Sequence, residues 1–435
     1  MSELKETKHQ QDKVIALHPR LAELHWGDAA SKSRFEEFER LVLSLGCPLQ
    51  ASVLLNVRRA LPATLIGRGQ AEDIARQVEV HEATVVFVDH QLSPIQQRNL
   101  EKAFNCKVMD RTGLILEIFG ARAKTREGVM QVELASLNYQ ISRLVRTWTH
   151  LERQRGGVGF MGGPGERQLE LDKRMIRDKI KRIEQDLAKV QQMRATQREG
   201  RKRRDVLTVA LVGYTNAGKS TLFNKITQAD AYVADQLFAT LDPTLRQIQL
   251  PNSVTLMMSD TVGFVQELPH ELVNAFRATL EEVIEADLIL HVRDISDAQS
   301  PNHKAVVMET LKALGLDGDH APPIIEVLNK IDLAPQVTTT IRDDIDGSRI
   351  ALSAISGQGM DDLMNILAKW SEQNMVELDL KLPIADGKTL AWCHEHGLVL
   401  SQQADDEWLT LKVRISPKFQ SQLQDWVVEE NYMCR

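Results

Sequence analysis

Cysteine is scarce in this sequence, and long apolar runs are missing from it. The 435 residues include four cysteines, and none of them stands in the close pairs typical of a disulfide framework or a zinc ribbon. No stretch approaches the roughly 18 consecutive apolar residues of a membrane-spanning helix, and the first residues lack the apolar core of a secretory signal. We therefore expect a protein of the reducing cytoplasm that does not insert into a membrane.

Aromatic residues are also few, at 5% of the chain, which argues against an extended surface for stacking bases. The net charge of −7 argues against a protein that coats nucleic acid with its whole surface. The hydrophobic share of 43% and the charged share of 26% are those of an ordinary globular protein. The length allows about two to four domains of roughly 100–200 residues each.

The order of apolar runs and helical patterns divides the chain into five segments. Residues 1–20 are expected to be a flexible tail, and residues 21–127 alternate strand-like and helix-like runs, as a small α/β domain does. Residues 128–205 are expected to form a basic helical hairpin with a glycine-rich tip. Residues 206–373 predict a mostly parallel sheet with helices on both faces, and residues 374–435 a small α+β domain. The fold class is therefore α/β with several domains.

Two heptad patterns predict the helical hairpin. Their apolar positions are Met130, Leu134, Leu137, Ile141, Leu144, Trp148 and Leu151, then Leu169, Ile176, Ile180, Ile183, Leu187 and Val190. From Arg143 to Arg204 there are 18 Lys or Arg against 8 Asp or Glu, so this segment carries +10 and the remaining chain −17. The excess favours contact with RNA phosphates, although a solvated basic face is the alternative. Six of the ten residues 156–165 are glycine, which suits either a plain connector or a tip whose backbone approaches RNA.

Residues 213–220 match the phosphate-loop pattern G-x-x-x-x-G-K-[S/T] in full, between an apolar strand and a helical segment. Backbone N–H groups of such a loop surround phosphates at the positive end of the following helix. Lys219 is expected to reach the β- and γ-phosphates, and the Ser220 hydroxyl to bind Mg²⁺. The predicted phosphate-binding residues are Gly213, Tyr214, Thr215, Asn216, Ala217, Gly218, Lys219, Ser220 and Thr221.

Two further segments complete the predicted phosphate and magnesium site. Asp260 follows an apolar run and opens an Asp-x-x-Gly pattern, in which the carboxylate holds Mg²⁺ through water and the Gly263 N–H meets the γ-phosphate. Upstream, Thr240 can supply a second hydroxyl to the metal. The residues predicted here are Phe238, Ala239, Thr240, Leu241, Asp242, Asp260, Thr261, Val262 and Gly263. We expect Lys219, Thr240, Asp260 and Gly263 to be catalytic, with Ser220 and Thr240 as metal ligands.

The base is predicted to be guanine. Asn329, Lys330 and Asp332 follow another apolar run, and a carboxylate there can accept hydrogen bonds from the N1–H and 2-amino group that adenine does not offer as a pair. Ser353, Ala354 and Ile355 end the next apolar segment, where a backbone N–H can reach the guanine oxygen. GTP is therefore the expected substrate, GDP the product and Mg²⁺ the cofactor. Phe264 stands where many GTPases carry a water-orienting glutamine, so intrinsic hydrolysis should be slow.

With these motifs in this order, the chain resembles the HflX family of bacterial GTPases over nearly all its length. The resemblance is carried by residues 64–74, 110–128, 168–174 and 238–244, and an apolar residue at position 264 agrees with the family. It implies a GTPase that binds the large ribosomal subunit and its rRNA and splits stalled or stressed ribosomes. It also implies ATP as a candidate ligand of the N-terminal domain. We expect a monomer.

Two other functions stay open from the sequence. The first is a ribosome-assembly or RNA-modification GTPase of the Obg or Era type, although a heptad hairpin ahead of the nucleotide-binding domain argues against it. The second is an RNA-binding scaffold whose nucleotide-binding domain only senses GTP, which Phe264 keeps possible.

Overall fold

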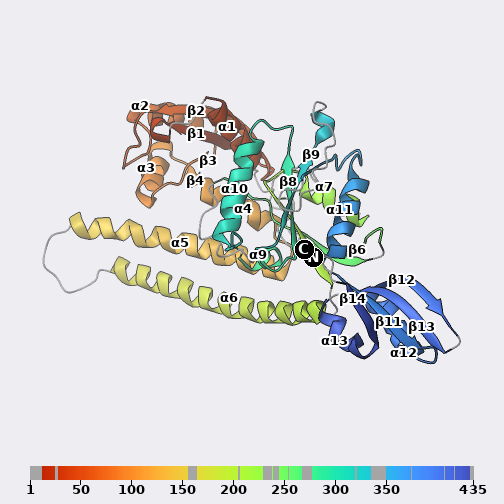
Figure 1. Ribbon diagram of the computed structural model, residues 1–435. Coiled ribbons are helices and arrows are strands. Elements are labelled where there is room, and N and C mark those ends of the chain that lie inside the picture. The colour runs from red at the N-terminus through yellow and green to blue at the C-terminus, as the bar shows by residue number, and fades with distance from the viewer. Residues whose placement is uncertain are drawn as a thin grey trace, which may run out of the picture. The chain divides into compact units, whose positions relative to one another are not determined.

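The computed structural model describes most of the chain. The described residues are 12–24, 28–154, 164–203, 206–228, 238, 244–252, 254–266, 277–318, 321–334, 349–373, 375–405, 407–415 and 417–431 (Figure 1). Residues 156–163 of the predicted hairpin tip and the predicted residues Ala239, Thr240, Leu241 and Asp242 lie outside them. The chain divides into two compact units. The first comprises Met1–Val190, Ala234–Asp242 and Val265–Thr279, and the second Gln191–Val233, Pro243–Phe264 and Leu280–Arg435.

The N-terminal part is built on a parallel sheet of four strands in the order β2-β1-β3-β4. The strands are β1 (Val14–Leu21), β2 (Leu49–Val57), β3 (Val85–Val88) and β4 (Lys107–Asp110). The helices are α1 (Asp28–Leu43), α2 (Arg68–His81), α3 (Pro94–Phe104) and α4 (Arg111–Arg122). Strand and helix alternate as the sequence pattern predicts, because parallel neighbours need a crossover helix between them.

Local capping explains where two of these helices begin. The Ser93 hydroxyl accepts a hydrogen bond from the N–H of Gln96 over 3.2 Å, and the Gln96 side chain accepts one from the N–H of Ser93 over 2.9 Å. Helix α4 begins in a similar way, since Oδ1 of Asp110 accepts from the N–H of Gly113 over 2.9 Å. Such caps satisfy N–H groups that have no partner within the helix.

The prediction of a flexible tail over residues 1–20 is wrong for its second half. Strand β1 lies between β2 and β3, and its first six residues are buried. His18 and Pro19 interrupt the apolar run, so the segment lacks the usual strand signature. Pro19 is tolerated because it lies beyond Leu17, the last residue of β1 that pairs with β3, where no ladder hydrogen bond is lost on that side.

The predicted helical hairpin is confirmed. Helices α5 (Arg126–Gln154) and α6 (Pro164–Arg203) run side by side (Figure 1). The predicted heptad positions Leu137, Ile183 and Leu187 form the buried cluster between them. Nζ of Lys179 lies 2.5 Å from the Glu133 carboxylate across the pair. Helix α6 continues to residue 203, beyond the end of the apolar pattern, so its last turns are defined by basic helix formers rather than by a buried stripe.

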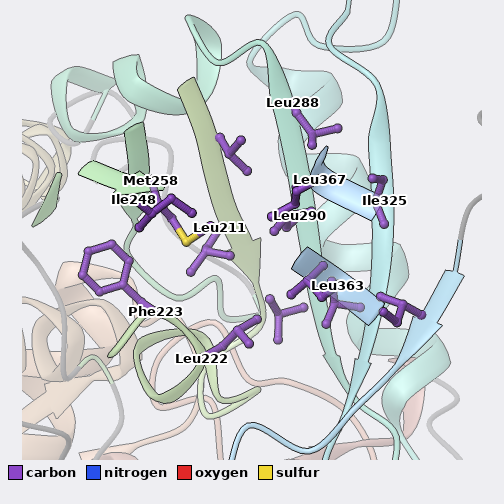
Figure 2. Close-up of a cluster of buried hydrophobic side chains, with 14 of the residues drawn as sticks. Leu211, Leu222, Phe223, Ile248, Met258, Leu288, Leu290, Ile325, Leu363 and Leu367 are labelled. Carbon is purple, nitrogen blue, oxygen red and sulfur yellow. The ribbon is translucent and has the colours of Figure 1, made fainter. Parts of the chain in front are cut away.

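The second sheet has six strands in the order β10-β9-β8-β5-β7-β6, and only β6 is antiparallel. The strands are β5 (Leu207–Gly213), β6 (Thr244–Gln249), β7 (Thr255–Asp260), β8 (Leu288–Asp294), β9 (Ile324–Asn329) and β10 (Arg349–Ala351). The helices are α7 (Lys219–Thr227), α9 (Arg277–Ile284), α10 (Ser300–Ala313) and α11 (Met360–Gln373). Figure 2 shows part of its core, in which side chains of α7 and α11 pack on the strands. The predicted α/β class with a mostly parallel nucleotide-binding sheet is confirmed.

The C-terminal segment forms an antiparallel sheet in the order β12-β13-β11-β14. Its elements are β11 (Val376–Pro383), α12 (Gly387–His396), β12 (Gly397–Ala404), β13 (Trp408–Ile415), α13 (Gln420–Leu423) and β14 (Val427–Asn431). The sequence pattern predicts a helix as the last element, but the structure shows a four-residue helix followed by strand β14. This strand carries two adjacent glutamates, so it lacks the alternation that marks a strand. Across the described ranges, no helix is both long and apolar enough to cross a bilayer.

Candidate functional site

The predicted motifs meet at one edge of the six-stranded sheet. The phosphate loop follows β5, Asp260 ends β7, Asn329 ends β9, and residues 352–354 follow β10. Because these strands are parallel, their carboxyl ends lie at the same edge, which is where ligands bind in open α/β sheets. The topology therefore brings together segments that are up to 140 residues apart in the sequence.

Gly218 is required by both the backbone and the space of the phosphate loop. Its φ of +91° lies in the region that favours glycine, and a Cβ atom there would stand 2.2 Å from Nδ2 of Asn329. Helix α7 begins at the next residue, Lys219, so the N–H groups of its first turn point toward the loop. This is a concave, positive backbone surface that suits a phosphate group.

Lys219 is a buried cation within this loop, with 6% of its surface exposed. Its ammonium donates hydrogen bonds to the carbonyl oxygens of Gly213, over 3.0 Å, and Tyr214, over 2.9 Å. Burial lowers the pKa of Lys219 to about 8, although the nearby Asp260 carboxylate opposes that shift. An anionic ligand in the loop would add negative charge beside the ammonium and favour its protonated form.

Ser220 and Asp260 form a pair of oxygen donors beside the loop. The Ser220 hydroxyl donates a hydrogen bond to Oδ2 of Asp260 over 2.7 Å. Next to them, the Thr261 hydroxyl donates to the carbonyl of Leu211 over 2.6 Å, which anchors this segment to β5. Hydroxyl and carboxylate oxygens are ligands that Mg²⁺ accepts, so the donor set fits that ion.

Gly263 packs directly against the phosphate loop. A Cβ atom at this position would lie 2.9 Å from Cγ2 of Thr215 and 3.1 Å from Nζ of Lys219, so only glycine fits without displacement. The backbone at Gly263 therefore lies next to Lys219, the lysine predicted to bind phosphate.

Phe264 faces the interior rather than a site for water. Its ring is buried, its N–H donates to the carbonyl of Gly213 over 3.1 Å, and its carbonyl accepts from the N–H of Thr215 over 2.8 Å. These two hydrogen bonds extend the pairing between the β7 segment and the phosphate loop. The ring is buried and has no group that could orient a water molecule.

Asn329 joins three loops of the site. Its side-chain amide donates to the carbonyl of Ala217 over 2.9 Å, and its side-chain oxygen accepts from the N–H of Ala354 over 3.0 Å. Nζ of the next residue, Lys330, lies 2.7 Å from the Asp294 carboxylate at the end of β8. Asp332 lies in the short 3₁₀ helix Ile331–Leu333 with its carboxylate exposed, and Ser353 is buried while Ile355 is exposed.

Two aromatic contacts of predicted site residues, one in each compact unit, leave no signal in the sequence. The ring of Tyr214, in the phosphate loop, stacks on the ring of His303 in α10, with centroids 3.9 Å apart and an angle of 8° between the planes. Of the predicted segment 238–242, the structure describes Phe238, whose ring is buried against the ring of Phe119 in helix α4. Both contacts join residues far apart in the chain, and no local pattern marks them.

Family models of known proteins match four consecutive parts of this chain. They are described as "GTP-binding GTPase N-terminal" over residues 32–120, "GTP-binding GTPase Middle Region" over 122–201, "50S ribosome-binding GTPase" over 208–330 and "HflX C-terminal domain" over 341–428. The matches follow one another without overlap.

Curated relatives match along nearly the whole chain. A GTPase HflX of Magnetococcus marinus is 46% identical over 98% of this chain and 97% of its own length. A GTPase HflX of Escherichia coli is 43% identical over 90% of both chains. Among solved structures, a GTP-binding protein from Sulfolobus solfataricus in complex with GDP is 22% identical, covers 83% of this chain and 99% of its own, and has a TM-score of 0.43.

Proposed function

This chain belongs to the HflX family of GTPases, and on that premise we propose that it binds the large ribosomal subunit and uses its GTPase cycle to dissociate stalled ribosomes. The proposal is supported by the exposed basic surface of α6, because positive side chains attract the phosphates of rRNA and the same chain carries a GTPase domain. The model matching residues 208–330 is described as a ribosome-binding GTPase, which agrees with it. The protein would then act in the cytoplasm, where ribosomes are.

The phosphates of GTP bind in the loop of residues 213–218 and at the N-terminus of α7. Lys219 compensates the charge of the β- and γ-phosphates, and the Gly263 N–H donates to the γ-phosphate. Ser220 and Thr240 would hold Mg²⁺ with Asp260 beside them, and the ion would supply positive charge to the phosphates. Since phosphoryl transfer depends mainly on positioning and charge stabilisation, these groups account for most of the expected catalysis.

Guanine is read by the loops after β9 and β10. The exposed Asp332 carboxylate accepts hydrogen bonds from N1–H and the 2-amino group, and a backbone N–H among residues 353–355 donates to the guanine oxygen. Asn329 does not need to touch the base, because its two hydrogen bonds hold the base-reading loop, the phosphate loop and the loop at Ala354 together.

Hydrolysis by the free protein is slow, and the ribosome stimulates it. The backbone of Phe264 forms hydrogen bonds with Gly213 and Thr215 of the phosphate loop, and its buried ring cannot activate water. A group from the ribosome, or one brought into place by it, must then orient the attacking water. Turnover measured with and without 70S ribosomes tests this step, and equal rates would contradict it.

The hairpin supplies the contact with RNA. Arg174 and Arg177 lie on α6 with exposed side chains, away from the buried cluster between the helices. Their charge attracts rRNA phosphates. Each phosphate contact that is lost reduces the slope of log affinity against log salt concentration by about one unit.

The experiment is a sucrose gradient of 70S ribosomes mixed with the protein and GTP, GDP or a non-hydrolysable GTP analogue. We expect the GTP forms to convert 70S ribosomes into subunits and GDP to leave them intact. Arg174→Glu combined with Arg177→Glu should weaken ribosome binding. It should also reduce the slope of log affinity against log salt concentration by about two units. Lys312→Glu combined with Lys388→Glu makes the same charge change at exposed sites outside the hairpin and is the control. Intact 70S ribosomes in every nucleotide state would contradict ribosome splitting and favour an assembly GTPase.

A further inference from the structure

The side chain of Tyr214, the second residue of the phosphate loop, is held by a histidine of helix α10. Tyr214 has 5% of its surface exposed, and its ring stacks on the ring of His303 with the centroids 3.9 Å apart and the planes at 8°. Stacked rings attract one another, and each limits the rotation of the other. His303 therefore restricts the orientation of the Tyr214 side chain.

His303 itself stands on a helix that is fixed to the sheet. Helix α10 packs on β5 and β8, and its residues Val307 and Leu311 are buried. These residues follow His303 at intervals of four, so all three share one face of the helix. Oδ2 of Asp297 lies 3.8 Å from Nδ1 of His303, at the edge of the ring whose face meets Tyr214. The histidine is thus a rigid partner for the loop.

The backbone of Tyr214 holds the Lys219 ammonium. That ammonium donates hydrogen bonds to the carbonyl oxygens of Tyr214, over 2.9 Å, and Gly213, over 3.0 Å. On either side of Tyr214, the carbonyl of Gly213 and the N–H of Thr215 form hydrogen bonds with the backbone of Phe264. The stacked ring adds a side-chain restraint to this segment. It therefore limits the movement of a carbonyl that contacts the lysine directly.

We propose that His303 is a positioning residue for GTP hydrolysis, which acts through Tyr214 to hold the Lys219 ammonium where the phosphates bind. The proposal rests on the phosphate site described above under the proposed function. A lysine that is held before the nucleotide arrives loses less freedom on binding, and its charge is already directed at the phosphates. GTP and GDP both carry a β-phosphate, so both should depend on His303.

The test measures kcat/KM for GTP and the Kd for GDP with the full chain in the absence of ribosomes. His303→Ala removes the stacked ring and should raise the Kd for GDP by about three- to tenfold, with kcat/KM for GTP falling by a similar factor. His303→Phe keeps a flat ring at this position and should restore most of both values. Wild-type values in His303→Ala, or equal losses in His303→Ala and His303→Phe, would overturn the proposal.

A second stack of the same kind provides the matched control. In the C-terminal segment, the ring of His396 lies on the ring of Trp392 with the centroids 4.5 Å apart and the planes at 11°. His396→Ala should therefore lower the Tm and leave the Kd for GDP and kcat/KM unchanged. If it weakens GDP binding as much as His303→Ala does, the effect is a general loss of stability and the proposal is overturned.

A double-mutant cycle tests whether His303 acts through Tyr214. The variant carrying His303→Ala and Tyr214→Leu should bind GDP no more weakly than Tyr214→Leu alone, because the partner ring is already absent. Additive losses would overturn the proposal. Lys219→Ala tests the phosphate site separately. If this variant binds GDP as tightly as the wild type, the proposed site is wrong, whereas weak binding by Lys219→Ala with wild-type binding by His303→Ala overturns the positioning role alone.

Nuclear magnetic resonance of the wild type keeps the proposal testable if His303→Ala does not fold. With isotopically labelled histidine rings, the His303 signal is the one that is absent from His303→Phe. Protons above the face of an aromatic ring resonate upfield, so those of the His303 ring should lie upfield of those of the exposed His394. We expect this displacement in the free and in the GDP-bound protein. A His303 signal at the position of His394 in either state would overturn the proposal.

Discussion

The side-chain amide of Asn329 donates a hydrogen bond to the carbonyl of Ala217 over 2.9 Å and so connects the end of β9 to the phosphate loop. The same side chain accepts from the N–H of Ala354. A residue of the predicted guanine-binding motif thus also holds the backbone of the predicted phosphate loop.

Asn329→Ala should therefore weaken GTP and GDP equally. The truncation leaves the buried N–H of Ala354 and the carbonyl of Ala217 without this partner, at a cost of about 1–3 kcal/mol for each group. Calorimetric titration of both nucleotides measures the loss. Asn252→Ala is a suitable control, since Asn252 bridges to Ala368, Ser371 and Glu372 away from these loops. A loss confined to GTP would show that Asn329 acts on the γ-phosphate side instead.

Asp332→Asn should change the preferred base from guanine to xanthine. The amide can donate to the additional carbonyl of xanthine and no longer accepts from both guanine donors. GTP affinity should fall by about 2–3 kcal/mol, the size of a lost charge-assisted pair. Competition between GTP and xanthosine triphosphate measures the change. Asp361→Asn, an equal charge change at an exposed position of α11, should leave the preference as it is. If Asp332→Asn still binds GTP more tightly than xanthosine triphosphate, another residue recognises the base.

Ser220→Ala should remove a magnesium ligand while leaving the phosphate loop intact. The hydroxyl that now contacts Asp260 is lost, and the Mg²⁺ concentration needed for half-maximal turnover should rise by about 10–100-fold. GDP should still bind, because the backbone N–H groups of the loop are unchanged. Turnover against Mg²⁺ concentration measures the shift, with Ser401→Ala, at an exposed position of β12, as control. If turnover depends on Mg²⁺ concentration in the same way as in the wild type, the metal is bound by other ligands.

His291 should make the stability of the nucleotide-binding part depend on pH. This residue of β8 is 1% exposed, and burial lowers its pKa to about 4, while Glu326 partly opposes the shift. The unfolded chain, with a histidine pKa near 6.5, therefore binds more protons than the folded chain between about pH 6.5 and pH 4. Stability is retained above pH 6.5 and is lost as the pH falls through this window.

Urea denaturation at pH 7 and pH 5 checks this expectation. The wild type should lose about 2 kcal/mol more than His291→Asn between the two values, because the amide does not titrate and the other groups are common to both chains. An equal loss in both would mean that folding does not lower the pKa of His291.

The meeting of the predicted segments at one edge of the six-stranded sheet was predictable, because each segment directly follows an apolar run that forms a strand of that sheet. The preceding apolar strand fixes the place of Gly218, Lys219 and Ser220 at the sheet edge, and their roles toward a phosphate and a metal ion stay predictions. The heptad hairpin was predictable for a similar reason, since its pattern repeats over many turns.

Other elements could not be read from local pattern. Strand β1 contains His18 and Pro19, and β14 contains consecutive glutamates, so tertiary pairing rather than periodicity makes them strands. The contact of Arg111 with Gln266 joins a side chain to a backbone carbonyl 155 positions away. Because every residue offers the same backbone oxygen, the acceptor leaves no trace in the sequence.

The pairing of Phe119 with Phe238 has a consequence for the order in which the protein is made. Phe238 follows Phe119 by 119 positions, so the growing chain presents α4 without its aromatic partner while those residues are added. At about 5–20 residues per second, that interval lasts roughly 6–24 s. During it the ring of Phe119 lacks the aromatic neighbour that packs against it in the folded protein. Folding of the N-terminal part is completed only when the phosphate loop and the segment after it have also been synthesised.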